Sequence, residues 1–142
     1  MKTALLFSGQ GAQAVGMGKD LAASYPAAAD LFAKADGILG YSLSQIAFEG
    51  PVDELTKTSV CQPALYTHGL AALAVLKEKF PALSFDAAAG LSLGEFTAHA
   101  SAGTFDFETG LRLVDQRSRF MQEACDGRLT RRGRQVWMGG GR

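Results

Sequence analysis

Short apolar runs that lead into glycine-rich turns alternate along this chain with longer segments of helical character. Residues 3–7 (TALLF) and 85–89 (FDAAA) are the two short runs. Apolar residues at helical spacing predict three helices: residues 27–35, 64–73 and 107–124. Asp106 precedes the last of these and is expected to cap it. The alternation predicts an α/β fold in which residues 4–7 and 87–90 form a short parallel sheet with flanking helices.

The second strand runs directly into a G-x-S-x-G sequence at residues 90–94. Between a strand and a helix, this motif forms a sharp turn that strains the serine backbone and lifts its hydroxyl above the sheet. Glycine is needed at both ends because strand and helix approach too closely there for a Cβ atom. The backbone N–H of Leu93 is then free to stabilise an oxyanion. Ser92 is therefore predicted to be a nucleophile that accepts an acyl group, although ordinary glycine–serine loops share the pattern.

The first strand ends in a second glycine-rich loop, in which Gly9 and Gly11 flank Gln10. The two glycines allow a tight turn that exposes the backbone amide of Gln10 at the end of the strand. In a doubly wound sheet the carboxyl ends of the strands form the active-site edge. Both glycine motifs are therefore expected to lie at one edge of the sheet.

A competing interpretation of this loop is dinucleotide binding, because Gly9, Gly11 and Ala14 fit the G-x-G-x-x-G/A fingerprint. That fingerprint requires an acidic residue about 20 positions further on, at the end of a second strand. The candidates are Asp30 and Asp36, and both belong to the segment expected to be helical. No β-branched run lies nearby to form the second strand, so this interpretation is disfavoured.

Four segments, taken in order, resemble the malonyl-CoA:acyl-carrier-protein transacylase family, which includes the acyltransferase domains of fatty-acid and polyketide synthases. They are residues 9–13 (GQGAQ), 62–65 (QPAL), 90–95 (GLSLGE) and 112–122 (RLVDQRSRFMQ). The resemblance covers about residues 1–126, which would be the amino-terminal part of the large subdomain. One departure is Leu91, where the family usually has His. The turn depends more on its glycines and serine than on this side chain.

The resemblance implies an incomplete α/β-hydrolase-like core without the family's small ferredoxin-like subdomain. It implies an acyltransferase of fatty-acid biosynthesis that moves malonyl from malonyl-CoA to Ser92 and then to the phosphopantetheine thiol of acyl carrier protein. The backbone amides of Gln10 and Leu93 would form the oxyanion hole, and Arg117, Gln10 and Gln62 would bind substrate. Malonyl-CoA and the carrier protein are substrates, so no separate cofactor and no metal are expected.

The role implied for Arg117 is to pair with the free carboxylate of the malonyl group. This role is chemically sensible, because a guanidinium matches a carboxylate bidentately and stays charged at any working pH. The commoner fate of a single helix arginine is to lie solvated at the surface.

A serine nucleophile needs a general base, usually a histidine. The two histidines are His68, in an apolar helical stretch, and His99, seven residues after Ser92. Two helical turns span roughly 10 Å, which is too far for a hydrogen bond. The resemblance places the catalytic histidine downstream of residue 142. The chain as given is therefore expected to lack its general base and to be impaired in transfer.

The composition changes abruptly near residue 126. Residues 1–126 carry nine Lys and Arg against fourteen Asp and Glu, whereas residues 127–142 carry five Arg and no acid. The basic tail, residues 127–142, is expected to be aberrant and disordered. A nucleic-acid-binding arm is one explanation; a shifted or truncated reading frame is preferred, because the resemblance ends where the composition changes.

The remaining features point to a cytoplasmic monomer without nucleic-acid or membrane partners. Cys61 and Cys125 form no C-x-x-C pair, which favours a reducing compartment. No apolar run approaches the 18 residues of a membrane span. Two other functions stay open: a serine hydrolase or esterase using the same turn, and a non-catalytic fragment that binds CoA or a partner weakly.

Overall fold

The computed structural model describes the backbone of residues 2–138 and the side chains of residues 2–127. Strands β1 (Ala4–Phe7) and β2 (Ala87–Gly90) pair in parallel, with Ala4 opposite Ala87 and Phe7 opposite Gly90. The helices are α1 (Lys19–Ser24), α2 (Pro26–Leu39), α3 (Leu43–Glu49), α4 (Val52–Thr56), α5 (Thr58–Lys79), α6 (Leu93–Ser101) and α7 (Phe107–Met138). The predicted α/β fold with a short parallel sheet and flanking helices is confirmed.

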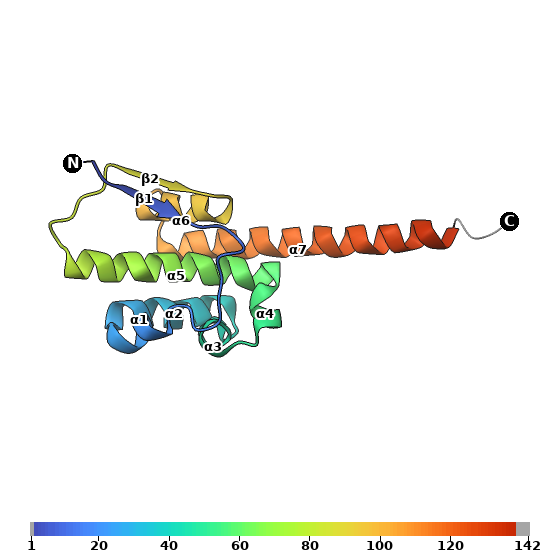
Figure 1. The fold of residues 1–142 in the computed structure, drawn as a ribbon, viewed down its shortest axis with the longest axis horizontal. Helices are drawn as coiled ribbons and strands as arrows, with labels where there is room; N and C mark the ends of the chain where they lie inside the picture. Colours follow the sequence, from blue (N-terminus) through green and yellow to red (C-terminus); the bar gives the residue numbers. More distant parts are fainter. Residues whose placement is uncertain (1, 139–142) are drawn as a thin grey trace.

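Both strands are apolar on both faces, which is typical of strands in buried parallel sheets. Helix α6 packs along the pair (Figure 1), and Phe7 lies between α6 and α5, where it contacts Gly69. On the other face Leu6 is 80% exposed, and Ala4, Ala87 and Ala89 are exposed beside it. The two-stranded sheet therefore presents an uncovered apolar face.

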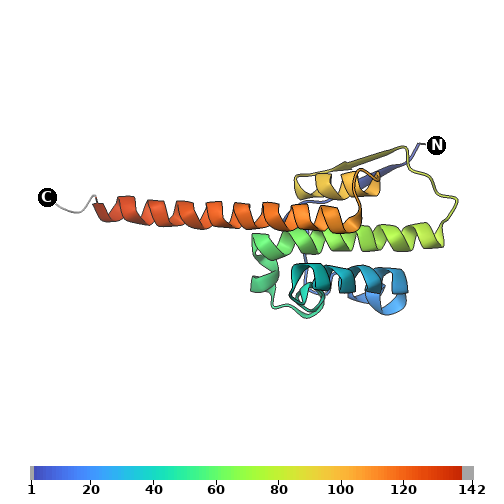
Figure 2. The ribbon, with the colours of Figure 1, turned by 180° about the vertical axis from the view of Figure 1, so that it is seen from behind.

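Helix α5 forms the centre of the molecule and packs against α7, α2 and α6 (Figures 1 and 2). Its N-terminal half is buried around most of its circumference, from Val60 to Thr67. By length and composition alone α5 could span a membrane, but 61% of its apolar window is buried inside the protein. Its apolar character is explained by its place in the core.

Helix α7 begins as predicted, because the Asp106 carboxylate accepts a hydrogen bond from the Thr109 N–H at 2.7 Å. The same bond holds the pKa of Asp106 below its usual value. The predicted end near residue 124 was wrong, since the helix continues through Met138. The disorder expected for residues 127–142 stays a prediction, and residues 139–142 lie outside the described part. The segment lacks proline and is rich in arginine, a good helix former.

The dinucleotide interpretation fails on topology. Asp30 and Asp36 lie within α2, so no described strand ends at either residue. Asp36 instead has a structural role: its Oδ1 accepts the Ser44 N–H at 2.9 Å near the start of α3.

The backbones of β1, β2 and α6 meet so closely that glycine is required. A Cβ on Gly90 would lie 2.0 Å from the carbonyl carbon of Gly94, and one on Gly94 would lie 2.3 Å from the Phe7 carbonyl oxygen. Real Cβ atoms essentially never approach so near, and backbone cannot move aside as a side chain can. The predicted need for glycine at both ends of the motif is confirmed.

Replacement of Gly90 by alanine should lower the free energy of unfolding by about 3 kcal/mol, because the methyl group overlaps backbone. Gly37→Ala is the matched control. Gly37 lies inside α2, where an added Cβ meets nothing within 4 Å. The control should stabilise the chain by about 0.5–1 kcal/mol. Urea denaturation of both variants measures this, and similar midpoints for the two would show that the crowding is not real.

Candidate active site

Ser92 lies in the sharp turn between β2 and α6, at the N-cap of the helix, with φ 53° and ψ −105°. Among the described residues, Ser92 is the one residue other than glycine that has a positive φ. Such a conformation is strained for a residue with a Cβ and is typical of functional turns. The preceding Leu91 is 74% exposed, so the turn imposes no packing requirement on that side chain.

The loop after β1 lies directly against this turn. A Cβ on Gly9 would be 2.5 Å from the Leu91 carbonyl oxygen, and the Leu91 N–H donates to the Phe7 carbonyl oxygen at 3.2 Å. Both glycine motifs thus meet at one edge of the sheet, as predicted. Within the described part of the chain, the backbone N–H groups of Gln10 and Leu93 have no intramolecular acceptor. Both remain available to bind an anionic oxygen.

Arg117 reaches this edge from α7. Its Nη2 donates to Ser92 Oγ at 2.9 Å, its Nη1 donates to Gln62 Oε1, and its guanidinium carbon lies 5.6 Å from the centre of the Phe96 ring. The prediction that Arg117 points toward Ser92 is confirmed. All three partners are neutral.

The absence of an acidic partner distinguishes Arg117 from its neighbours on α7. Arg112 pairs with Glu108 at 2.8 Å and Arg119 pairs with Asp115 at 3.0 Å, each with the acid four residues before it. Arg117 has apolar residues four positions away on either side and forms no ion pair among the described residues. Its positive charge is therefore not neutralised within the described structure.

Gln62 joins Arg117 to the Gln10 loop. Its side chain is 1% exposed, and its Nε2 donates to Gln10 Oε1 and to Met121 Sδ, both at 3.4 Å. Gln10 in turn donates to Thr58 Oγ1 at 3.1 Å. Sequence reasoning named Gln62 but missed Phe96, Met121 and Thr58. The spacing of Met121, four residues after Arg117 on one helix, could have indicated it.

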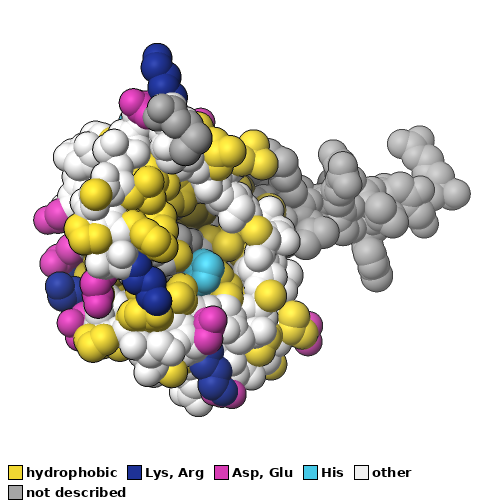
Figure 3. Space-filling model, turned by 60° about the vertical axis from the view of Figure 1, so that its left-hand side comes forward, with side chains coloured by type: hydrophobic (Ala, Val, Ile, Leu, Met, Phe, Trp, Pro, Cys, Tyr) yellow, Lys and Arg dark blue, Asp and Glu magenta, His cyan; other side chains and the backbone are white. Residues whose placement is uncertain are grey.

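Neither histidine hydrogen-bonds to Ser92. His68 lies half-buried on α5, where burial lowers its pKa and the charge of Asp20 opposes this shift. It lines an apolar groove between β1 and α5, and Figure 3 shows apolar side chains around a hollow on one side of the molecule. The ring of His99 lies 3.4 Å from Thr104 Oγ1. Among the described residues, no group of three or more His, Cys, Asp or Glu could hold a metal ion.

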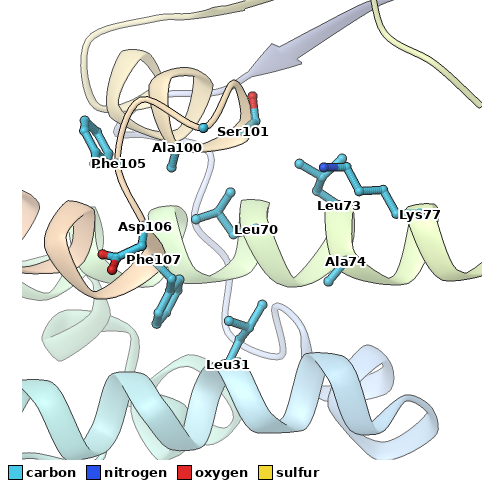
Figure 4. A pocket seen from close by; sticks show the side chains of 11 residues that line it. Leu31, Leu70, Leu73, Ala74, Lys77, Ala100, Ser101, Phe105, Asp106 and Phe107 are labelled. Atoms are coloured by element: carbon cyan, nitrogen blue, oxygen red, sulfur yellow. The ribbon is translucent and has the colours of Figure 1, made fainter.

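A separate apolar pocket of about 520 Å³ lies between α2, α5 and the end of α6 (Figure 4). Leu31, Leu70 and Phe107 line it, with Lys77 and Asp106 as its charged residues. Ser92, Gln62 and Arg117 are not among its lining residues. The pocket is therefore distinct from the candidate site.

Comparison with known proteins places this geometry in context. The acyl transferase domain family matches residues 4–135. A malonyl CoA-acyl carrier protein transacylase of Haemophilus influenzae is 46% identical over 123 residues, covering 87% of this chain and 39% of that protein. The corresponding Bacillus subtilis protein is also 46% identical, covering 87% of this chain and 38% of that protein.

Solved structures of transacylases are also similar to this chain. A malonyl-transacylase in complex with a type II polyketide acyl carrier protein is similar with a TM-score of 0.83 and 42% identity, over 87% of this chain and 40% of that chain. An acyl carrier protein S-malonyltransferase from Vibrio cholerae gives a TM-score of 0.82 and 40% identity, with the same two coverages. The chain thus spans about two fifths of the length of the relatives it matches.

The strain at Ser92 predicts an unusual stability difference. Ser92→Gly and Ser92→Ala both lose the hydroxyl and its bond to Arg117, so their difference isolates the backbone. Glycine tolerates positive φ, and we expect Ser92→Gly to be more stable by about 1 kcal/mol, after its greater entropy in the unfolded chain is allowed for. Thermal or urea unfolding measures this, and an alanine variant of equal or higher stability would mean that the turn is unstrained.

Proposed function

The chain belongs to the acyl transferase domain family, and we propose that it forms part of an enzyme that transfers malonyl from malonyl-CoA to an acyl carrier protein. The single observation that carries this proposal is the hydrogen bond from Arg117 to Ser92. It puts an unneutralised cation beside the candidate nucleophile, as a substrate with both a thioester and a carboxylate requires. The names of the relatives, malonyl CoA-acyl carrier protein transacylases, support the same substrates.

The proposed reaction has two steps. Ser92 Oγ attacks the thioester carbonyl of malonyl-CoA, loses its proton to a general base and displaces the CoA thiol, which leaves a malonyl ester on the serine. The phosphopantetheine thiol of the carrier protein then attacks the ester, takes the malonyl group and regenerates the serine hydroxyl. The backbone N–H groups of Gln10 and Leu93 would stabilise the oxyanion in both steps.

Arg117 would select the substrate. Its present partners are a hydroxyl, an amide oxygen and an aromatic ring. A carboxylate makes stronger charge-assisted bonds than these, so a malonyl group can take over Nη2 from Ser92 Oγ. An acetyl group has no such anion. The serine hydrolase alternative is disfavoured, because none of the cited relatives is named a hydrolase.

In this proposal the general base belongs to the part of the full-length enzyme that this chain does not span, which is the larger part of the relatives. The uncovered apolar face of β1 and β2 fits such an arrangement, since parallel strands are normally covered on both faces. We further propose that residues 1–126 form the amino-terminal part of the large subdomain and that the ferredoxin-like subdomain belongs to the remainder. A cytoplasmic, monomeric state is also proposed; a human relative is named mitochondrial.

Purified chain incubated with malonyl-CoA should acquire a malonyl group on Ser92, detected by intact-mass analysis and peptide mapping. Labelling should be about 10²–10⁴-fold slower than in a full-length relative, because neither His68 nor His99 hydrogen-bonds to Ser92. Malonyl-CoA should be preferred over acetyl-CoA. Arg117→Ala should reduce the preference by about 2–3 kcal/mol, the scale of a lost charge-assisted bond.

Arg112→Ala is the matched control, because Arg112 is on the same helix but already paired with Glu108; its preference should not change. Equal losses for both thioesters in Arg117→Ala would refute selection of the carboxylate. Label that persists in Ser92→Ala would refute the serine as acceptor.

Transfer should be restored when the rest of the enzyme is present. In a chimera, residues 1–126 replace the matching part of the Haemophilus influenzae relative, and transfer of radiolabelled malonyl to acyl carrier protein is measured. Activity within about tenfold of that relative is expected, and it should vanish in the Ser92→Ala chimera. A folded but inactive chimera would count against these residues as half of an acyltransferase site.

A further inference from the structure

We propose that Gln62 is a positioning residue, which fixes Arg117 relative to the Gln10 loop without contacting the acyl group. This inference rests on the proposed function, because it assigns Arg117 to the substrate carboxylate. Gln62 is 1% exposed, and its side chain projects from α5 to bond Arg117 on α7 and Gln10 in the loop after β1. A residue so buried, with both ends of its amide bonded, acts on substrate through its neighbours.

The bonds of Gln62 specify one orientation of its amide. Oε1 accepts from Arg117 Nη1, and Nε2 donates to Gln10 Oε1 and Met121 Sδ. In the opposite orientation, an NH₂ group would face the guanidinium donors and a carbonyl oxygen would face the Gln10 carbonyl oxygen. Both contacts would be repulsive, so the network permits only the orientation in which the oxygen faces the cation.

This arrangement fixes one half of the guanidinium and leaves the other half for the substrate. Gln62 holds Nη1, and the Phe96 ring supports the guanidinium from a centre-to-carbon distance of 5.6 Å. Neither contact needs to break when a carboxylate replaces Ser92 Oγ at Nη2. A neutral acceptor suits this position, because a carboxylate at residue 62 would compete with the substrate for the same cation.

Gln62 also sets the distance between the two ends of the substrate site. Through its other end it bonds the side chain of Gln10, whose backbone N–H is a proposed oxyanion donor. One buried amide therefore links the group proposed for the carboxylate with the group proposed for the thioester carbonyl. Aligning these two ends matters because misplacement by about 1 Å can cost 10²-fold in rate.

The test uses the chain of 142 residues labelled with ¹⁵N. Gln62→Met keeps the length and loses both polar contacts, whereas Gln62→Glu keeps an acceptor and adds a charge. Gln122→Met is the matched control, since Gln122 also bonds across α5 and α7, accepting from the Thr58 N–H at 3.0 Å. Two quantities are measured: the NMR signals of the Arg117 guanidinium, identified by their loss in Arg117→Lys, and the ratio of malonyl-CoA to acetyl-CoA labelling at Ser92.

In the unmodified chain and in Gln122→Met, the Arg117 guanidinium should rotate slowly and give resolved signals. The malonyl preference of Gln122→Met should equal that of the unmodified chain. Gln62→Met should average these signals and lower the preference about tenfold, the effect of one lost hydrogen bond to a charged group. Gln62→Glu should keep the signals resolved yet also lower the preference, because its carboxylate neutralises the cation. If Gln62→Glu lowers the malonyl preference while the Arg117 signals stay resolved, the protein is still folded around Arg117. The lost preference is then not caused by unfolding.

Resolved signals and an unchanged preference in Gln62→Met would overturn the proposal. If the unmodified chain shows no malonyl preference while the Arg117 signals still depend on Gln62, the proposed function fails and the positional link alone stands. If the preference depends on Arg117 but none of the residue-62 variants changes it, the proposed function stands and the role of Gln62 fails.

Discussion

The site depends on the close approach of three backbone segments at glycine. A Cβ on Gly90, Gly94 or Gly9 would lie within 2.5 Å of a neighbouring backbone atom. This crowding holds the end of β1, the end of β2 and the start of α6 in one place. Because the chain must then turn sharply from β2 into α6, Ser92 is left at positive φ with its hydroxyl toward Arg117. The strain at the nucleophile is thus a consequence of the packing that positions it.

Beside this turn lies the positive charge of Arg117, which forms no ion pair among the described residues. Helix α7 pairs its other described arginines with acids one turn away, but its sequence gives Arg117 no such partner. The core helix α5 contributes Gln62, which satisfies the guanidinium with a neutral oxygen. A buried glutamine is a costly residue unless both ends of its amide are bonded. The three bonds of Gln62 therefore stabilise the core and orient the guanidinium of Arg117 together.

Local sequence patterns sufficed for the elements that carry the site. The strands, the turn at Ser92 and the cap at Asp106 were predicted from local patterns, because glycine spacing and capping residues act over a few positions. The direction of Arg117 followed instead from the family resemblance. The network through Gln62 was not, since its partners Gln10 and Arg117 are 52 and 55 residues away. The full length of α5 was also missed, because an apolar surface around most of a helix erases its periodicity. The extension of α7 was missed because a change in charge was taken for a change in structure.

The central claim is that Arg117 holds Ser92 through a contact that a substrate carboxylate replaces. A crystal structure of this chain with malonate bound tests it most directly. The account predicts a malonate carboxylate within about 2.9 Å of Arg117 Nη2, the Arg117–Gln62 bond retained, and Ser92 Oγ released. Malonate bound elsewhere, or Arg117 turned toward an acidic side chain or the solvent, would contradict it.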